Sequence, residues 1–339
     1  MKQNYSFSRP LMPESHASGR LQFIDGAKGF ALICVMLGHT EGGAVVTYID
    51  NMLLPVFWVA AGYTSHPDFR ISRRFRSLFL PYLFMSLACL IFMLLVNPAS
   101  VGMRSMIGIL YSRFKLFPFA DAADSFRMMN IDNSVLWFLT SMFTAYCLFR
   151  LLLDIRCDRN RILGAIACVA VGYVYPYIPL LLPWSLDTAF FIAPLMLGGN
   201  MVRRYGILEH YGWKLLLLSV PAYMACNYFA GATNYSIREM GVFYPASFGC
   251  GLFGAVALFV LFRLPFCSYM SRAFAFLNAK ALYIFGLQLV FLETGLRFGM
   301  HFGLPLWLTV SLQIIIAVAG GYLSGVIAGK LTDLFPRRG

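Results

Sequence analysis

Three ionisable residues, Asp25, Lys28 and His39, stand in the apolar stretch FIDGAKGFALICVMLGHT at residues 23–40. On one continuous α-helix, the eleven steps from Lys28 to His39 make about three full turns, so both side chains share a face with Asp25. The helical rise places His39 about 16 Å farther along the axis than Lys28. An ionisable group at bilayer depth costs roughly 2.5–3.5 kcal/mol, so such residues usually face a polar cavity and act there. The pattern predicts a charged column that enters a membrane.

Two interpretations of this column stay open. In the first, Asp25 and Lys28 pair at the water boundary, and His39 makes a hydrogen bond to a neighbouring helix. In the second, His39 is a general base, neutral near physiological pH and able to take a proton from a hydroxyl.

A second basic feature is the segment RISRRFRSLFLPY at residues 70–82. Arg73 and Arg76 are three residues apart, so on a helix they are neighbours and present two guanidinium groups to an anion such as a phosphate. The alternative is a topology anchor beside a membrane span, which is the role we expect for Arg70 and Arg74.

The composition indicates a polytopic membrane protein. Of the 339 residues, 59% are apolar and only 12% are charged, and the mean hydropathy is +0.70. A soluble domain has about 25% charged residues. The net charge of +12 is attributed to basic residues in the loops on one side of the membrane, which set the orientation of the spans. Nucleic acid is excluded as a partner because no basic run with interleaved aromatics stands apart from the loops.

Ten apolar runs predict an all-α fold of about ten transmembrane helices around a central cavity. They lie near residues 26–48, 52–65, 78–96, 134–153, 162–182, 187–202, 213–230, 241–262, 279–298 and 304–328. If the N-terminus is inside, 21 of the 27 basic residues fall on the same side, so both termini are predicted to be cytoplasmic.

Two segments depart from this regular pattern. The run at 52–65 is short for a span of about 20 residues, but a re-entrant hairpin there would move later arginine clusters outside, so a short span is predicted. Residues 97–133 form a long external loop, whose apolar part at 106–119 is predicted to lie along the membrane surface.

The remaining segments define the domain organisation. Residues 1–22 are predicted to be a cytoplasmic segment without a cleavable signal peptide, 23–330 an integral membrane domain, and 331–339 a cytoplasmic tail. The eight cysteines fall mostly in apolar runs and form no CxxC pair. They are read as small packing residues, with neither a disulfide framework nor a metal site.

The order of four motifs resembles the membrane-bound acyltransferase 3 family, which moves acyl groups onto sugar hydroxyls of cell-surface glycans. These motifs are FIDGAKGFALICVMLGH, LPVFWVAAGYT, RRFRSLFLPY and LWFLTSMF. Two later segments, PWSLDTAFFIAPLMLGGN and LNAKALYIFGLQLVF, resemble the family's middle and late helices. The likeness covers residues 23–330, and the basic residue before a histidine is its most specific part.

The resemblance implies a multi-pass enzyme of the inner (cytoplasmic) cell membrane that uses an acyl-coenzyme A, with acetyl-coenzyme A expected, as cytoplasmic donor. The acceptor is a glycan or lipid-linked sugar reached from the outer side. The family's motifs map onto Lys28 with His39, and onto Arg73 with Arg76. Coenzyme A phosphates would dock at the three basic residues, with Asp25 in support, and His39 would be the catalytic base.

Three positions depart from the family pattern. Lys28 replaces the usual Arg, which keeps the charge but loses the fork of donors. Ala61 replaces the usual Ser of an SGY box, so no hydroxyl role is assigned there. Gln288 replaces a late-helix histidine, which leaves His39 as the expected sole base.

Two competing classes remain. A transporter or flippase of a lipid-linked glycan would use the charged column as a passage and would neither transfer nor hydrolyse an acyl group. An acyltransferase-like scaffold that lost its activity is disfavoured by the presence of His39.

Overall fold

The protein is built from helices. The computed structural model describes residues 21–66, 68–113, 115–117, 135–174 and 180–333, and these contain no β-strand. The longer helices are α1 (Gln22–Gly38), α2 (Asp50–Thr64), α3 (Ile71–Val96), α5 (Trp137–Asp154), α6 (Asp158–Val174), α7 (Leu186–Arg204), α9 (Leu215–Ala230), α10 (Tyr244–Arg263), α12 (Ala281–His301) and α13 (Leu306–Asp333). The shorter helices are α4 (Met103–Tyr111), α8 (Ile207–Tyr211) and α11 (Ser268–Asn278).

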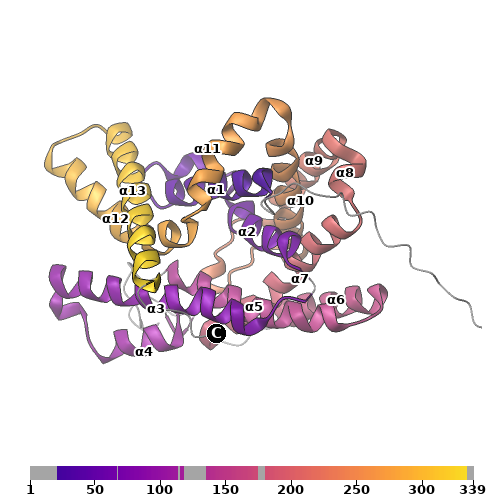
Figure 1. Cartoon of the computed structure of the whole chain (residues 1–339), viewed down its shortest axis with the longest axis horizontal. Helices are drawn as coiled ribbons and strands as arrows, with labels where there is room; N and C mark the ends of the chain where they lie inside the picture. The colour runs from indigo at the N-terminus through magenta and orange to yellow at the C-terminus, as the bar shows by residue number, and fades with distance from the viewer. Residues whose placement is uncertain (1–20, 67, 114, 118–134, 175–179, 334–339) are drawn as a thin grey trace, which may run out of the picture.

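The helices surround α1, α2 and α7. In Figure 1, α3, α5 and α6 lie along one edge, α12 and α13 occupy one end, and α8, α9 and α10 lie toward the other. Helix α7 contacts α2, α5 and α6, and α1 packs against α2 and α11. The first two helices therefore lie mostly inside the molecule, where Asp25 of α1 and Asn51 of α2 are buried.

Close packing fixes α2 against α7. A Cβ atom on Gly62 would collide with the backbone of Met196, and one on Gly199 would collide with the backbone of Val59. Small residues at such crossings let two helices approach closely, which is a common way to associate helices in membranes. The beginning of α2 is thereby held in a defined place.

Five segments are long and apolar enough to cross a membrane. They are α3, Pro183–Arg204, α10, α12 and most of α13. The other five predicted runs hold α1, α2, α5, α6 and α9, which have 15 to 18 residues and are short for a span of about 20. The all-α membrane character is confirmed, whereas the number of spans and their orientation stay predictions.

The first predicted run differs from the structure. Residues 26–48 were expected to form one helix, but α1 ends at Gly38. The backbone tightens there, because His39 N–H donates to Met36 O at 3.0 Å and Thr40 N–H to Leu37 O at 3.0 Å. The Thr40 hydroxyl also donates to Leu37 O at 2.8 Å, satisfying a terminal carbonyl. His39 therefore lies at a helix end and not inside a continuous helix.

Several sequence predictions fall partly outside the described residues. These are the cytoplasmic segment 1–22, the tail 331–339 and the second half of the loop 97–133. Within that loop, α4 carries exposed apolar side chains at Met103, Met106 and Leu110. Its attachment to the protein includes hydrogen bonds from Tyr82 OH to Ile109 O and from Tyr111 OH to Leu181 O.

Candidate functional site

A cavity of about 690 Å³ lies where α1 ends and α2 begins. The other walls come from the end of α9 with the loop after it, from Val135 and Trp137 at the start of α5, and from Phe285 in α12. Apart from Phe285, these lining residues lie at or near helix ends, and the predicted orientation places those ends on the external side of the membrane. The predicted orientation therefore places the cavity in the outer half of the protein.

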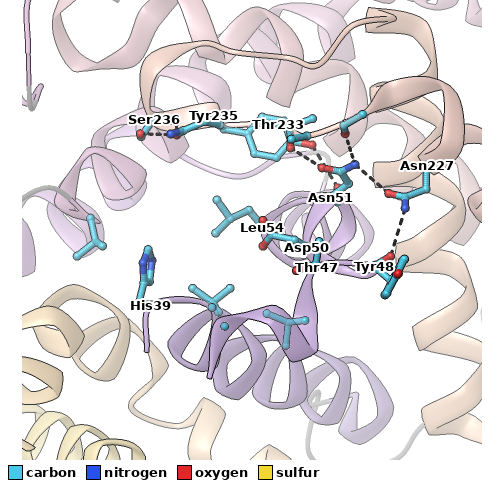
Figure 2. A pocket seen from close by; sticks show the side chains of 18 of the residues that line it. His39, Thr47, Tyr48, Asp50, Asn51, Leu54, Asn227, Thr233, Tyr235 and Ser236 are labelled. Atoms are coloured by element: carbon cyan, nitrogen blue, oxygen red, sulfur yellow. Dashed lines mark hydrogen bonds between the residues drawn. The ribbon is translucent and has the colours of Figure 1, made fainter. Parts of the chain in front are cut away.

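His39 contributes an imidazole to this cavity. The abrupt end of α1 leaves the ring accessible, and Figure 2 shows it standing apart from the hydrogen-bonded side chains across the open space. Within the described part of the chain, the ring makes no hydrogen bond. A histidine with unused ring nitrogens in a cavity can accept a proton from a bound hydroxyl.

Asp50 is a second titratable group of the cavity, and the sequence reasoning missed it. It is the first residue of α2 and lines the same cavity as His39 (Figure 2). Among the described residues, its carboxylate forms no hydrogen bond or ion pair. An acid in a first helical turn also stabilises the helix N-terminus, so Asp50 has a structural reason to be there. The sequence signal that could have indicated Asp50 is the pair Asp50–Asn51 directly before the apolar run at 52–65.

A hydrogen-bonded group centred on Asn51 forms the opposite wall. Its Nδ2 donates to Asn227 Oδ1 at 2.8 Å and to Gly231 O at 2.7 Å, while Thr233 Oγ1 donates to Asn51 Oδ1 at 2.7 Å (Figure 2). Tyr235 OH donates to the Asn51 backbone oxygen at 3.2 Å. The side-chain amide of Asn51 is thus fully used in joining α2 to α9 and the following loop.

Aromatic rings supply the apolar part of the lining. Tyr235 is backed by Trp58, with ring centroids 5.1 Å apart, and Phe285 packs against Phe138 at 4.7 Å. Trp137 lines the cavity from the start of α5. A mostly apolar, pre-formed cavity with a few unused polar groups is typical of a small-molecule binding site.

The predicted column at the start of α1 has a different surrounding. Asp25 is buried and accepts a hydrogen bond from Asn278 Nδ2 at 2.5 Å, which ties α1 to α11. Lys28 is partly buried, and neither residue lines the cavity. The structure therefore separates Asp25 and Lys28 from His39, and their roles toward a donor stay predictions.

Arg73 and Arg76 lie in the first turns of α3, where both are exposed. The helix confirms that they are neighbours on one face. Arg74 behaves differently, because its guanidinium lies 4.6 Å from the ring of Tyr146 and 5.8 Å from that of Phe69. This cation–π contact holds the Arg74 side chain against the protein, whereas its two neighbours stay exposed. The role of Arg74 as a topology anchor stays a prediction.

The two other family departures lie outside the cavity lining. Ala61 offers its backbone oxygen to Ser65 Oγ at 2.6 Å. Gln288 is completely buried, and neither its Oε1 nor its Nε2 has a hydrogen-bond partner in the described part of the protein.

Of the cysteines interpreted as packing residues, Cys34, Cys89, Cys250 and Cys267 are buried, whereas Cys157 is exposed.

The family model Acyl_transf_3, described as an acyltransferase domain, matches residues 21–328. No curated protein and no solved structure matches the chain.

Proposed function

Since this match shows that the chain belongs to the acyltransferase 3 family of membrane acyltransferases, we propose that it transfers an acyl group from a coenzyme A thioester to a glycan hydroxyl. The observation that carries the proposal is the cavity in which His39 and Asp50, both without hydrogen-bond partners among the described residues, face the same space. We propose an acetyl group as the cargo and the inner cell membrane as the location.

The donor is proposed to bind from the cytoplasm. Arg73 and Arg76 are exposed neighbours on α3 and can hold the phosphates of coenzyme A through charge-assisted hydrogen bonds. Lys28 is proposed to assist. The extended arm of the donor would then carry the thioester toward His39, so the coenzyme need not cross the membrane.

His39 is proposed to act as general base. Its imidazole takes the proton of the acceptor hydroxyl while that oxygen attacks the thioester carbonyl. Collapse of the tetrahedral intermediate breaks the carbon–sulfur bond, and the coenzyme A thiolate leaves and takes the proton from the imidazolium. The carboxylate of Asp50 can accept a hydrogen bond from a second acceptor hydroxyl, which would orient the attacking oxygen.

The acceptor is proposed to be a cell-surface or lipid-linked glycan. A volume of about 690 Å³ falls within the range of roughly 300–1,000 Å³ for small-molecule sites, so the cavity can take one or a few sugar units. The mixture of aromatic rings and polar groups suits a sugar, which has both apolar faces and hydroxyls.

The test is acyl transfer by purified protein in lipid discs, with radiolabelled acetyl-coenzyme A and de-acylated surface glycan from cells that lack the protein. His39→Ala is expected to lower kcat by about 10²–10⁴-fold. The matched control is His301→Ala, because His301 also ends a helix but does not line the cavity. Equal activity of both variants would leave His39 structural, and glycan movement without any acyl transfer would favour a flippase.

A further inference from the structure

Three charged residues outside the cavity lining meet in the protein interior. The side chains of Arg113, Asp187 and Arg238 are 0%, 0% and 1% exposed. They come from the chain after α4, from the first turn of α7 and from the loop between α9 and α10. Buried charges are costly unless they are paired and hydrogen-bonded, so such a cluster must satisfy its members closely.

Arg113 connects α7 to the cavity wall. One terminal nitrogen, Nη2, donates to Asp187 Oδ1, and the other, Nη1, donates to the backbone oxygen of Ser236 at 2.8 Å. Its Nε donates to Leu182 O at 3.1 Å. Ser236 lines the cavity, so this guanidinium directly joins the buried ion pair to the lining.

Arg238 adds a second connection two residues after Ser236. Its Nη1 lies 3.4 Å from Asp187 Oδ2 and 3.1 Å from Leu180 O. The carboxylate also accepts from Leu182 N–H at 3.2 Å and from Thr188 N–H at 2.9 Å. A single carboxylate therefore holds both arginines and the chain that enters α7.

The segment 233–238, here named the 233–238 wall because its residues 233–236 line the cavity, is thus held at two ends. Toward α2, Thr233 and Tyr235 bond to Asn51. Toward α7, Ser236 and Arg238 bond to the ion cluster. The backbone also closes into a loop here, since Asn234 and Glu239 exchange hydrogen bonds of 2.7 and 2.9 Å.

We propose that Arg113, Asp187 and Arg238 are positioning residues that fix the 233–238 wall at the separation from His39 and Asp50 that the acceptor requires. The identity of the ligand as an acceptor rests on the proposed function, whereas the fixing of the wall does not. A cluster that served only general stability would not act on this wall in particular.

The first arm of the test measures the wall directly by amide hydrogen exchange. Arg113→Lys keeps the charge but loses the fork of donors, and Asp187→Asn is the milder second variant. The control is Arg161→Lys, since Arg161 is also buried, pairs with Asp158 at 2.9 Å and bonds to Leu152 O at 3.2 Å, away from the cavity.

Exchange at the backbone amides of Asn234, Ile237, Arg238 and Glu239 is expected to accelerate at least about tenfold in the two cluster variants, because the local opening of the wall becomes easier. The same amides should not change in Arg161→Lys. Unchanged exchange in both cluster variants, or equal acceleration in the control, would overturn the proposal.

The second arm measures acyl transfer to the de-acylated surface glycan. The cluster variants are expected to raise the apparent KM for this glycan by about tenfold to a hundredfold, with the KM for acetyl-coenzyme A unchanged, since small misplacements of a binding wall have effects of that size. Faster exchange with an unchanged glycan KM would overturn the positioning role. A wild-type protein that never acylates the glycan contradicts the proposed function, and the exchange arm then decides whether the cluster holds the wall.

Discussion

Two groups of arginines in this protein use the same side chain in opposite ways. Arg113 and Arg238 are buried and bonded to Asp187 and to backbone carbonyls. Arg73 and Arg76 are exposed on α3 and form no hydrogen bond or ion pair with other described residues. The first group directs most of its donors into the fold, whereas the donors of the second group stay exposed.

The difference teaches that surroundings, more than residue type, decide what an arginine does. The start of α3 shows the same contrast within one segment. The guanidinium of Arg74 stacks on Tyr146, while Arg73 and Arg76 stay exposed. An arginine that is buried and bonded inside the protein acts on structure. An arginine with free donors at the surface can bind an anion.

The largest expected effect concerns the side of the membrane on which each group lies. On a cysteine-free background, Val242→Cys should react with a membrane-impermeant maleimide in intact cells, and Arg159→Cys only after permeabilisation. Both sites are exposed, and the excess of basic residues predicts this orientation. The reverse labelling would put the exposed arginines outside and remove the proposed cytoplasmic donor site.

The second prediction compares a buried ion pair with an exposed one. Asp187→Ala leaves two buried guanidinium groups without their carboxylate and should lower the free energy of unfolding by about 3–5 kcal/mol. Asp154→Ala is the control, because its 3.0 Å pair with Arg150 is partly exposed and should be worth only about 0.3–0.5 kcal/mol. Denaturant unfolding in detergent micelles measures both, and equal losses would contradict the contrast between the groups.

The third prediction tests the exposed group. In an Arg73→Gln, Arg76→Gln double variant, the apparent Kd of a non-hydrolysable acyl-coenzyme A analogue should rise by about tenfold or more per arginine, because hydrogen bonds to charged groups contribute about 1.5–3 kcal/mol. Calorimetric titration gives the affinity, and unfolding should stay within about 0.5 kcal/mol of the wild type, as is usual for surface substitutions. Unchanged affinity would make both residues topology anchors.

The smallest effect is expected at Lys28. Arginine at this position keeps the charge and adds a fork of donors, so a phosphate site should tolerate it or bind somewhat more tightly, with a change within about threefold. The same titration measures it. A large loss of donor affinity in Lys28→Arg would contradict a phosphate contact at this position.

Much of the fold could be predicted because hydrophobic pattern is local information. Each of the ten apolar runs contains a helix. The low content of charged residues predicted a membrane protein, and five long apolar helices support this class. The motifs around Lys28, His39, Arg73 and Arg76 sufficed to indicate the acyltransferase 3 family, which the match over residues 21–328 confirms. These inferences need only residue type and spacing along the chain.

The site could be predicted only in part, because a cavity is formed by residues distant in sequence. His39 was found from its motif, but Asp50, Asn51 and the loop at 231–236 join it only through the packing of α1, α2 and α9. The early end of α1 was missed because the run 26–48 is apolar throughout most of its length, and hydropathy does not report where backbone bonds tighten.

The sequence by itself determined the class of protein, most of the helical segments and the family to which the chain belongs. The tertiary structure alone decided which charged residues are buried and hydrogen-bonded within the protein and which stay exposed to solvent. Arg113 looked like one more basic residue of an external loop, yet its guanidinium lies fully buried against Asp187 and the Ser236 carbonyl. The physical reason is that burial and hydrogen-bond completion depend on partners 74 and 123 residues away, which local sequence patterns do not contain.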